Sequence, residues 1–208
     1  MQSSAYKLSE FFIVFILVPV SFAIEYPIWI KIIIGLLGFL YILFVLLRVE
    51  KNKFRIAQNL DWSSFIKRTF LQLIGIALLT TSYVWFVDSS NLYVVVLNKP
   101  LLWLTILFLY SFFSVYPQEL IYRTFFFQRY LSLFKNKTLF IIVNAALFSL
   151  AHIFFKNGLV MIITFFGGIL FALTYRNTKS TLLVTIEHAI YGCWLFTVGM
   201  GEMLGFPH

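Results

Sequence analysis

The sequence predicts an all-α protein, a polytopic transmembrane helical bundle of seven or eight helices. The first observation is composition: hydrophobic residues make up 61% and charged residues 12% of the 208 positions. Soluble domains are about 45–50% apolar and about 25% charged, and a soluble fold of this size could not hide so much apolar side chain. The second observation is a series of long apolar runs. A mean hydropathy of +0.92, ten glycines and one cysteine exclude disordered, collagen-like and disulfide-stapled proteins.

The predicted elements follow from the length of a membrane crossing, which needs about 20 apolar residues. The runs of suitable composition are residues 11–24, 28–47, 69–87, 101–116, 138–155, 159–175 and 181–204. The first and fourth are short and end near Pro19 and Pro117, as expected of a residue that interrupts helices. Segment 118–134 is apolar but carries Glu119 and Arg123. It is predicted to be an eighth membrane segment or a partly submerged helix.

No internal repeat, low-complexity tract or linker divides the sequence. A single integral-membrane domain over residues 1–208 is therefore predicted, with a motif-bearing half at about 116–208. The first run also has the length of a signal-peptide core, but a second apolar run follows it almost at once. A retained span is the favoured interpretation.

Segment 59–68 precedes the third run and is predicted to begin an interfacial helix that continues into this span. Asn59 or Asp61 is the expected N-cap, because Asn and Asp side chains accept hydrogen bonds from the first turn of a helix. Trp62 suits the headgroup region of a bilayer. We interpret the segment as a surface anchor rather than as a docking site for substrate.

The formal net charge of +8 indicates membrane topology rather than binding to nucleic acid. With seven crossings, thirteen of the sixteen basic residues lie on one side of the membrane. They are Lys7 and the basic residues of segments 48–68, 118–137 and 176–180. The positive-inside rule makes this side, and the N-terminus, cytoplasmic. The predicted location of so compact a chain is a bacterial inner membrane, with membrane lipid as its surroundings and no nucleic-acid partner.

Five ionisable residues lie inside apolar runs where charges are not expected: Glu119, Arg123, His152, Glu187 and His188. A charge at mid-membrane costs about 2.5 kcal/mol or more, so such residues usually face protein or water and indicate function. The first two are four residues apart and share a helix face, which also allows a purely structural ion pair. A carboxylate and two imidazoles that converge in a bundle core could activate water, either by general-base catalysis or on a metal ion.

These residues belong to three short motifs. They are QELIYR at 118–123, FSLAH at 148–152 and HAIYG at 188–192. The set resembles the motifs Glu-Glu-x-x-x-Arg, Phe-x-x-x-His and His-x-x-x-Asn of the CAAX protease and bacteriocin-processing (CPBP) family, also called Abi, which occur in this order on separate transmembrane helices. The resemblance runs from Tyr116 to the C-terminus. It implies an intramembrane endopeptidase, in a family that includes enzymes trimming prenylated CAAX tails.

The sequence departs from the family pattern at two positions. Gln118 stands where the prenyl-protease branch has the glutamate that is usually given the water-activating role, and glutamine cannot take a proton. Gly192 stands where the third motif has an asparagine that helps to hold the oxyanion. Two interpretations remain: Glu119 serves as the base in this chain, which is the favoured one, or the chain has lost catalysis.

The resemblance implies a role for each matching residue. Glu119 and His152 would hold and deprotonate a water molecule, and His188 would donate to the tetrahedral oxyanion. Gln118 would position the peptide or the water, and Arg123 matches the arginine of the first motif. The family is described both as metal-dependent and as glutamate-dependent; with a zinc ion, Glu119, His152 and His188 would be the three ligands that leave an open position. The substrate would be a membrane-associated protein or peptide.

Two other functions remain open from the residues alone. One is a catalytically inactive relative that acts as a membrane scaffold or immunity protein, consistent with Gln118 and Gly192. The other is a small proton-coupled transporter, in which Glu119 and the histidines form a relay across the membrane. An enzyme needs these groups in one cluster, whereas a relay needs them along a path.

Three further features are interpreted as structural. Gly167 and Gly168 are expected to allow close approach of two helices. Asn144, about two turns before His152, is a candidate supporting residue. Glu187 is expected to face away from its neighbour His188, because adjacent residues do not share a helix face.

Overall fold

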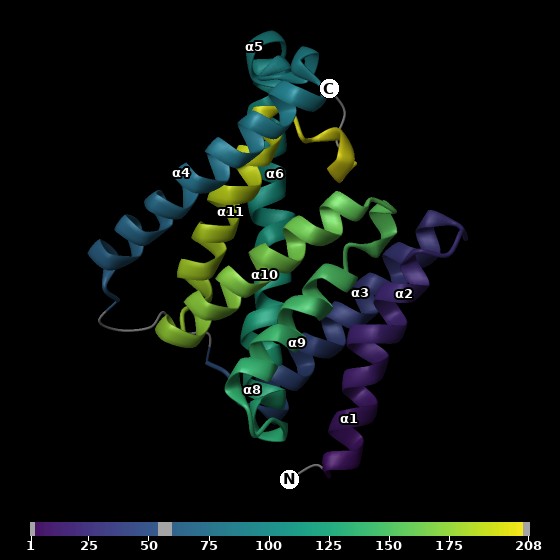
Figure 1. Ribbon diagram of the computed structural model, residues 1–208. Coiled ribbons are helices and arrows are strands. Elements are labelled where there is room, and N and C mark those ends of the chain that lie inside the picture. Colours follow the sequence, from purple (N-terminus) through teal and green to yellow (C-terminus); the bar gives the residue numbers. More distant parts are fainter. Residues whose placement is uncertain (1–2, 54–59, 206–208) are drawn as a thin grey trace. The chain divides into compact units, whose positions relative to one another are not determined.

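A computed structural model describes residues 3–53 and 60–205, which are almost entirely helical and contain no strand (Figure 1). Within this part of the chain, seven helical stretches are long and apolar enough to cross a membrane. They are Ser4–Phe22, Ile28–Val49, Trp62–Val87, Pro100–Leu133, Lys137–Phe155, Gly158–Thr178 and Thr181–Val198. Each matches one of the predicted runs. The predicted class, an all-α polytopic membrane protein, is confirmed.

The fourth stretch corrects a predicted boundary, because the helix does not end near Pro117 but continues to Leu133. The segment expected as a separate eighth element is therefore part of the fourth. Pro117 lies in α7 (Tyr116–Glu119), with the π-helical turns η4 (Tyr110–Val115) before it and η5 (Leu120–Phe125) after it. A proline lacks the N–H of an α-helical hydrogen bond, and π turns pair residues five apart. The changed pairing accommodates the ring inside a continuous helix.

The chain forms two compact units, each built from two stretches of sequence. The first unit comprises Met1–Arg55 and Leu120–Arg176. The second unit comprises Ile56–Glu119 and Asn177–His208. The predicted single domain stays a prediction, and the units are described in turn.

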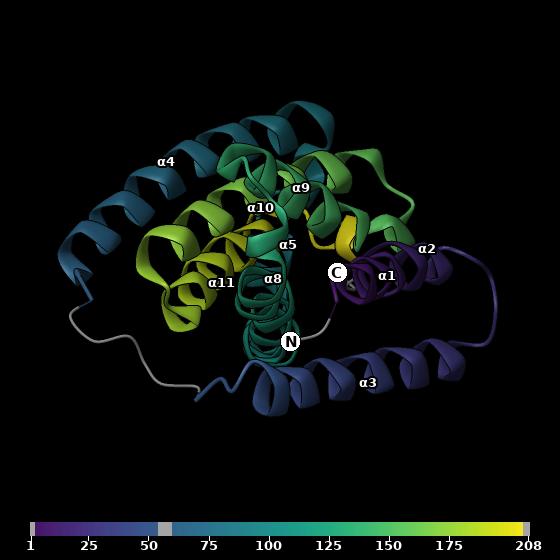
Figure 2. The same cartoon turned by 90° about the horizontal axis from the view of Figure 1, so that it is seen from below.

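The first unit contains the N-terminal helices and most of the second half of the chain. Its elements are α1 (Ser4–Phe12), η1 (Ile13–Leu17), α2 (Val18–Phe22), α3 (Ile28–Phe44), η2 (Val45–Val49), η5, α8 (Phe126–Tyr130), η6 (Leu131–Leu133), α9 (Lys137–Leu150), η7 (Ile153–Phe155) and α10 (Gly158–Thr178). α1, η1 and α2 form one continuous helical rod, Ser4–Phe22. Figure 2 shows the loop that leads from α2 to α3.

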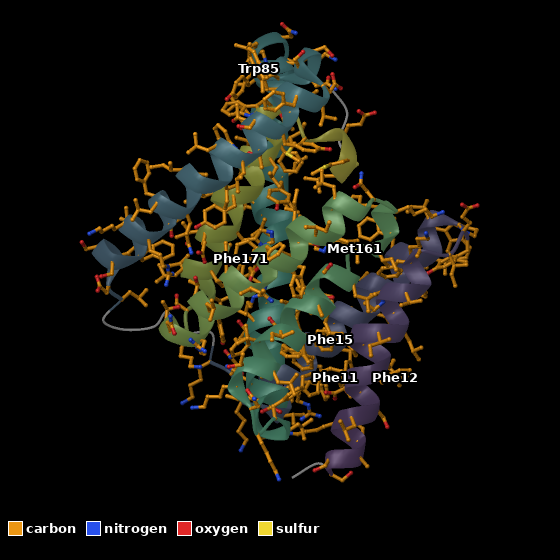
Figure 3. All side chains as sticks on the ribbon, in the orientation of Figure 1. Phe11, Phe12, Phe15, Trp85, Met161 and Phe171 are labelled. Atoms are coloured by element: carbon orange, nitrogen blue, oxygen red, sulfur yellow. The ribbon has the colours of Figure 1, made fainter. Side chains whose placement is uncertain are left out.

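Aromatic side chains fill the interior of the first unit. Phe15 is fully buried, with its ring centroid 5.1 Å from that of Phe126 and 5.8 Å from that of Tyr130. Phe12 on the opposite side of the same rod is 49% exposed and points outward (Figure 3). Aromatic pairs at such distances add about 0.5–1.5 kcal/mol each beyond the area they bury. The N-terminal rod is thus part of the core of this unit.

A buried ion pair also crosses this interior. Arg129 Nε and Nη2 donate to the two carboxylate oxygens of Glu10 over 2.7 and 2.9 Å, and Arg129 Nη1 donates to Glu50 Oε1 over 2.9 Å. The hydroxyls of Tyr41 and Tyr130 each donate to Glu10 over 2.6 Å. The side chains of Arg129 and Glu10 are 1% and 3% exposed. These bonds join α1, α3, α8 and Glu50, the residue that follows η2.

Close contact between α9 and α10 depends on a glycine. A Cβ atom added to Gly168 would lie 3.0 Å from the Cα atom of Ala145, which is fully buried. This contact confirms for Gly168 the expectation of close helix approach, whereas a Cβ atom on Gly167 would meet only Phe171 of the same helix.

Replacement of Gly168 by leucine is therefore expected to lower the free energy of unfolding by about 1–3 kcal/mol, because the new side chain overpacks the α9–α10 contact. Gly38→Leu is the matched control, since nothing lies within 4 Å of a Cβ at that position of α3. Denaturant titration of the detergent-solubilised protein measures both variants. Equal stability of the two would contradict the packing role of Gly168.

The second unit contains the third span, the start of the fourth and the last. Its elements are α4 (Trp62–Val87), η3 (Ser89–Asn91), α5 (Val94–Asn98), α6 (Pro100–Leu109), η4, α7, α11 (Thr181–Val198) and η8 (Glu202–Leu204). α11 packs against α4, and Figure 1 shows the two helices side by side. The indole N–H of Trp194 on α11 donates to Thr80 Oγ1 on α4 over 2.9 Å.

The start of α4 and the end of α11 each have a clear local cause. Asp61 is the N-cap of α4, as predicted, and its Oδ1 accepts a hydrogen bond from the Ser64 backbone N–H over 3.0 Å. This bond holds the pKa of Asp61 below its usual value. The alternative cap, Asn59, lies outside the described residues. α11 ends at Val198 rather than at 204 as predicted, because Gly199 adopts a left-handed conformation with φ of +106°.

Candidate active site

The structure brings together the first and third motifs. Glu119 ends α7, His188 lies in the middle of α11, and His188 Nδ1 is 2.7 Å from Glu119 Oε1. Glu119 is fully buried and His188 is 5% exposed. A hydrogen bond this short between an imidazole N–H and a carboxylate is charge-assisted. Two residues 69 positions apart in sequence thus form one buried polar pair.

The second nitrogen of His188 contacts Tyr110, the first residue of η4. The Tyr110 hydroxyl oxygen is 3.1 Å from His188 Nε2. Hydrogen bonds therefore link a phenol, an imidazole and a carboxylate in a line. Sequence reasoning missed Tyr110, because tyrosine is common in this chain, with eleven copies.

Gln118 is anchored within its own helix. Its Nε2 donates to Ser114 Oγ, one turn earlier, over 2.8 Å. Its buried Oε1 accepts no hydrogen bond from the described residues. The amide is thus fixed at one end next to Glu119, which is compatible with the expected role of positioning a peptide or a water molecule.

Arg123, the last residue of the first motif, lies in the first unit and contacts the second motif. It is fully buried in η5, and its Nη1 donates to Asn144 Oδ1 over 2.8 Å. Its guanidinium lies 4.8 Å from the ring centroid of Phe148, a cation–π arrangement. Asn144 Nδ2 in turn donates to the Tyr122 carbonyl over 2.7 Å. The arginine and the asparagine together tie η5 to α9.

His152 does not lie inside a helix, which corrects the expectation that it does. α9 ends at Leu150, and His152 occupies the turn before η7. Its Nδ1 is 2.8 Å from the Phe148 carbonyl oxygen, and the two rings are 4.9 Å apart. The two residues of the Phe-x-x-x-His motif are thus in contact, one in the last turn of α9 and the other among the residues after it. Through Phe148, the histidine is linked to Arg123.

Glu187 has different surroundings from His188, as expected from its position on α11. It is fully buried, and the Tyr191 hydroxyl lies 3.3 Å from its Oε1. The same hydroxyl lies 2.9 Å from Gln72 Oε1 on α4. Glu187 therefore belongs to the α4–α11 contact.

The alternative of a zinc site can be examined from the donor atoms. Among the described residues, no group of three or more His, Cys, Asp or Glu side chains could hold a metal ion. Glu119 and His188 contact each other directly, and the other nitrogen of His188 faces Tyr110. His152, the third predicted ligand, belongs to the first unit, and a zinc site formed by all three residues stays a prediction.

The comparisons with known proteins agree with the motifs. Residues 100–194 match the family model described as type II CAAX prenyl endopeptidase Rce1-like. This segment contains all three motifs together with Tyr110 and Gly192. No match was found among curated proteins or among solved structures. Through residues 100–194, slightly less than half of its length, the chain is similar to the Rce1-like group of CAAX-type prenyl endopeptidases of the CPBP family.

Proposed function

We propose that the chain is an active intramembrane endopeptidase that hydrolyses a peptide bond in a membrane-associated, CAAX-like protein or peptide. The observation that carries the proposal is the 2.7 Å contact between His188 and Glu119. It joins two motifs of a protease family around a buried carboxylate. A carboxylate held by an imidazole is a suitable general base for water.

In the proposed reaction, Glu119 takes a proton from a water molecule through its second oxygen, while Oε1 stays bonded to His188. The water oxygen forms a bond to the carbonyl carbon of the scissile peptide, and the carbonyl oxygen becomes an oxyanion. When the intermediate collapses, the C–N bond breaks and Glu119 returns the proton to the leaving amine. The products are a carboxylic acid and an amine, and the base is regenerated.

His188 orients the base in this mechanism. Its Nδ1–H points at Glu119 Oε1 and restricts rotation of the carboxylate. When both ring nitrogens carry protons, the imidazolium also supplies a positive charge next to the developing oxyanion. The expected role as oxyanion stabiliser is thereby combined with a second role, as the partner of Glu119.

We assign His152 to water activation on its place in the second motif, and Arg123 to a supporting role. The contacts in the first unit support this assignment for Arg123, because its guanidinium packs on Phe148 and Phe148 contacts His152. Loss of Arg123 would leave His152 poorly oriented. Gln118 is proposed to hold the peptide or the water through its amide.

We also propose a location in a bacterial inner membrane with the N-terminus in the cytoplasm. The support is the distribution of basic residues over alternate connections. Membrane lipid surrounds the spans, and the substrate would reach the site from the bilayer.

The family match does not favour the two other functions. An inactive scaffold protein would not need the Glu119–His188–Tyr110 line. A proton relay would need ionisable groups along a path across the membrane, whereas here His188 is hydrogen-bonded to both Glu119 and Tyr110 in one cluster. Hydrolysis is therefore the function to test.

The test is cleavage of defined peptides by the purified chain in lipid nanodiscs, read by mass spectrometry. The panel contains a farnesylated peptide with a CAAX end, the same peptide without the lipid, and a signal-peptide remnant. We expect cleavage of the lipidated peptide, with a loss of at least tenfold in His188→Ala and in His152→Ala. Intact peptides throughout, with correctly folded wild-type protein, would contradict a CAAX-like protease.

A further inference from the structure

Position 192 is a glycine whose side-chain space is already filled. A Cβ atom added to Gly192 would overlap the hydroxyl oxygen and ring carbon Cε1 of Tyr110. Gly192 and Tyr110 belong to α11 and η4 of the same unit. A side chain at 192 and the phenol at 110 therefore compete for one volume, and in this chain the phenol occupies it.

The phenol is held firmly in this volume. Its ring packs edge-on against Phe196 with centroids 4.8 Å apart, and against His188 with centroids 6.0 Å apart. Gly192 lies between these two residues, four positions from each, so all three share a face of α11. The hydroxyl is thereby fixed 3.1 Å from His188 Nε2.

The line of hydrogen bonds determines where the phenolic proton can point. When His188 carries both ring protons, Nδ1–H donates to Glu119 and Nε2–H donates to the Tyr110 oxygen. The hydroxyl proton of Tyr110 is then available for another acceptor. A phenol that accepts a bond from an imidazolium is also a stronger donor, because successive hydrogen bonds polarise one another.

We propose that Tyr110 is a catalytic residue whose hydroxyl group donates a hydrogen bond to the oxyanion of the tetrahedral intermediate. The phenol occupies the space that a side chain at position 192 would otherwise fill. The inference rests on the proposed peptide hydrolysis and adds a specific donor to it. It also accounts for Gly192, where the motif has asparagine. Tyrosine hydroxyls are among the side-chain donors that stabilise such oxyanions.

Removal of the hydroxyl alone is the first test. Tyr110→Phe keeps the ring and its packing on Phe196 but loses the donor. We expect kcat to fall about 10²–10³-fold, as for loss of one oxyanion donor, with KM within a few-fold and unchanged thermal stability. Tyr116→Phe, on the same helical stretch but 45% exposed, is the control and should leave kcat unchanged.

Exchange of the two positions is the second test. Tyr110→Ala should lose activity through loss of the donor, and Gly192→Asn should lose it because the new side chain overlaps the phenol. The double variant Tyr110→Ala/Gly192→Asn restores a donor in the same space, so its kcat should exceed that of Tyr110→Ala by at least about tenfold.

The outcomes separate this inference from the proposed function. Full activity in Tyr110→Phe, while Glu119→Gln is inactive, would overturn the role of Tyr110 alone. A double variant no better than Tyr110→Ala would do the same. A wild-type chain that cleaves none of the peptides would overturn both, because no hydrolysis would then need a donor. If Tyr110→Phe lost thermal stability as well as activity, the loss of activity would be assigned to the packing of Tyr110 and not to donation to the oxyanion.

Discussion

Replacement of Glu119 by glutamine is expected to lower kcat for peptide hydrolysis by about 10²–10⁴-fold, the contribution of a well-placed general base. Glutamine has nearly the same size and its carbonyl oxygen can still accept the bond from His188 Nδ1. It cannot take a proton from water. The loss should therefore appear in kcat with little change in KM, measured on the lipidated peptide under saturating conditions.

A second buried carboxylate provides the control for this experiment. Glu187 lies on α11 next to His188 and is as buried as Glu119, but it belongs to the contact with α4. Glu187→Gln is expected to retain near wild-type kcat. If both variants lost activity equally, or if Glu119→Gln stayed active, Glu119 could not be the base. Thermal unfolding of both variants shows whether a loss reflects folding instead.

Hydropathy was sufficient to predict the fold class, because a segment that crosses a lipid bilayer has to be a long apolar helix whose backbone hydrogen bonds are satisfied internally. All seven spans follow from it, and the Asp61 cap follows from side-chain chemistry. The end of the fourth span could not be predicted, because Pro117 normally interrupts a helix and π turns leave no mark in hydropathy. The end of the last span depends on the positive φ of Gly199, which hydropathy does not report.

Part of the candidate site was predictable for a related reason. Glu119 and His188 attract notice because ionisable residues are costly in lipid. Tyr110 does not attract notice, because an aromatic ring is common in a membrane span and only its hydroxyl group is polar. The one available signal was Gly192, since a missing side chain in a motif implies that another group fills the space. Such a substitution points to a partner but does not identify it without coordinates.

The Glu10–Arg129 pair was also missed, for another reason. Arg129 is one of the basic residues that the sequence assigns to membrane topology, and Glu10 lies close to the start of a predicted span. Their separation of 119 residues gives no local pattern, and a periodicity argument sees only neighbours on one helix. Charges near the ends of spans therefore have two interpretations, orientation in the membrane and pairing inside the protein.

This pair leads to the largest expected effect on stability. Arg129→Met should lower the free energy of unfolding of the protein in detergent by about 3–5 kcal/mol, because the carboxylate of Glu10 stays buried without its cation. The double variant Glu10→Gln/Arg129→Met should recover a substantial part of this loss, since replacing both members of a buried pair is often nearly neutral. Unfolding by denaturant, followed by tryptophan fluorescence, measures each variant.

An exposed ion pair of the same unit is the matched control for that measurement. Lys156 Nζ and Glu25 Oε1 are 2.9 Å apart, as close as Arg129 and Glu50, but their side chains are 60% and 88% exposed. Water and salt screen such a pair, so Lys156→Met is expected to leave the unfolding midpoint unchanged within error. The contrast tests burial rather than distance as the source of the effect. If Arg129→Met were as harmless as Lys156→Met, or if the double variant were no more stable than Arg129→Met, the buried network would not hold α1, α3 and α8 together.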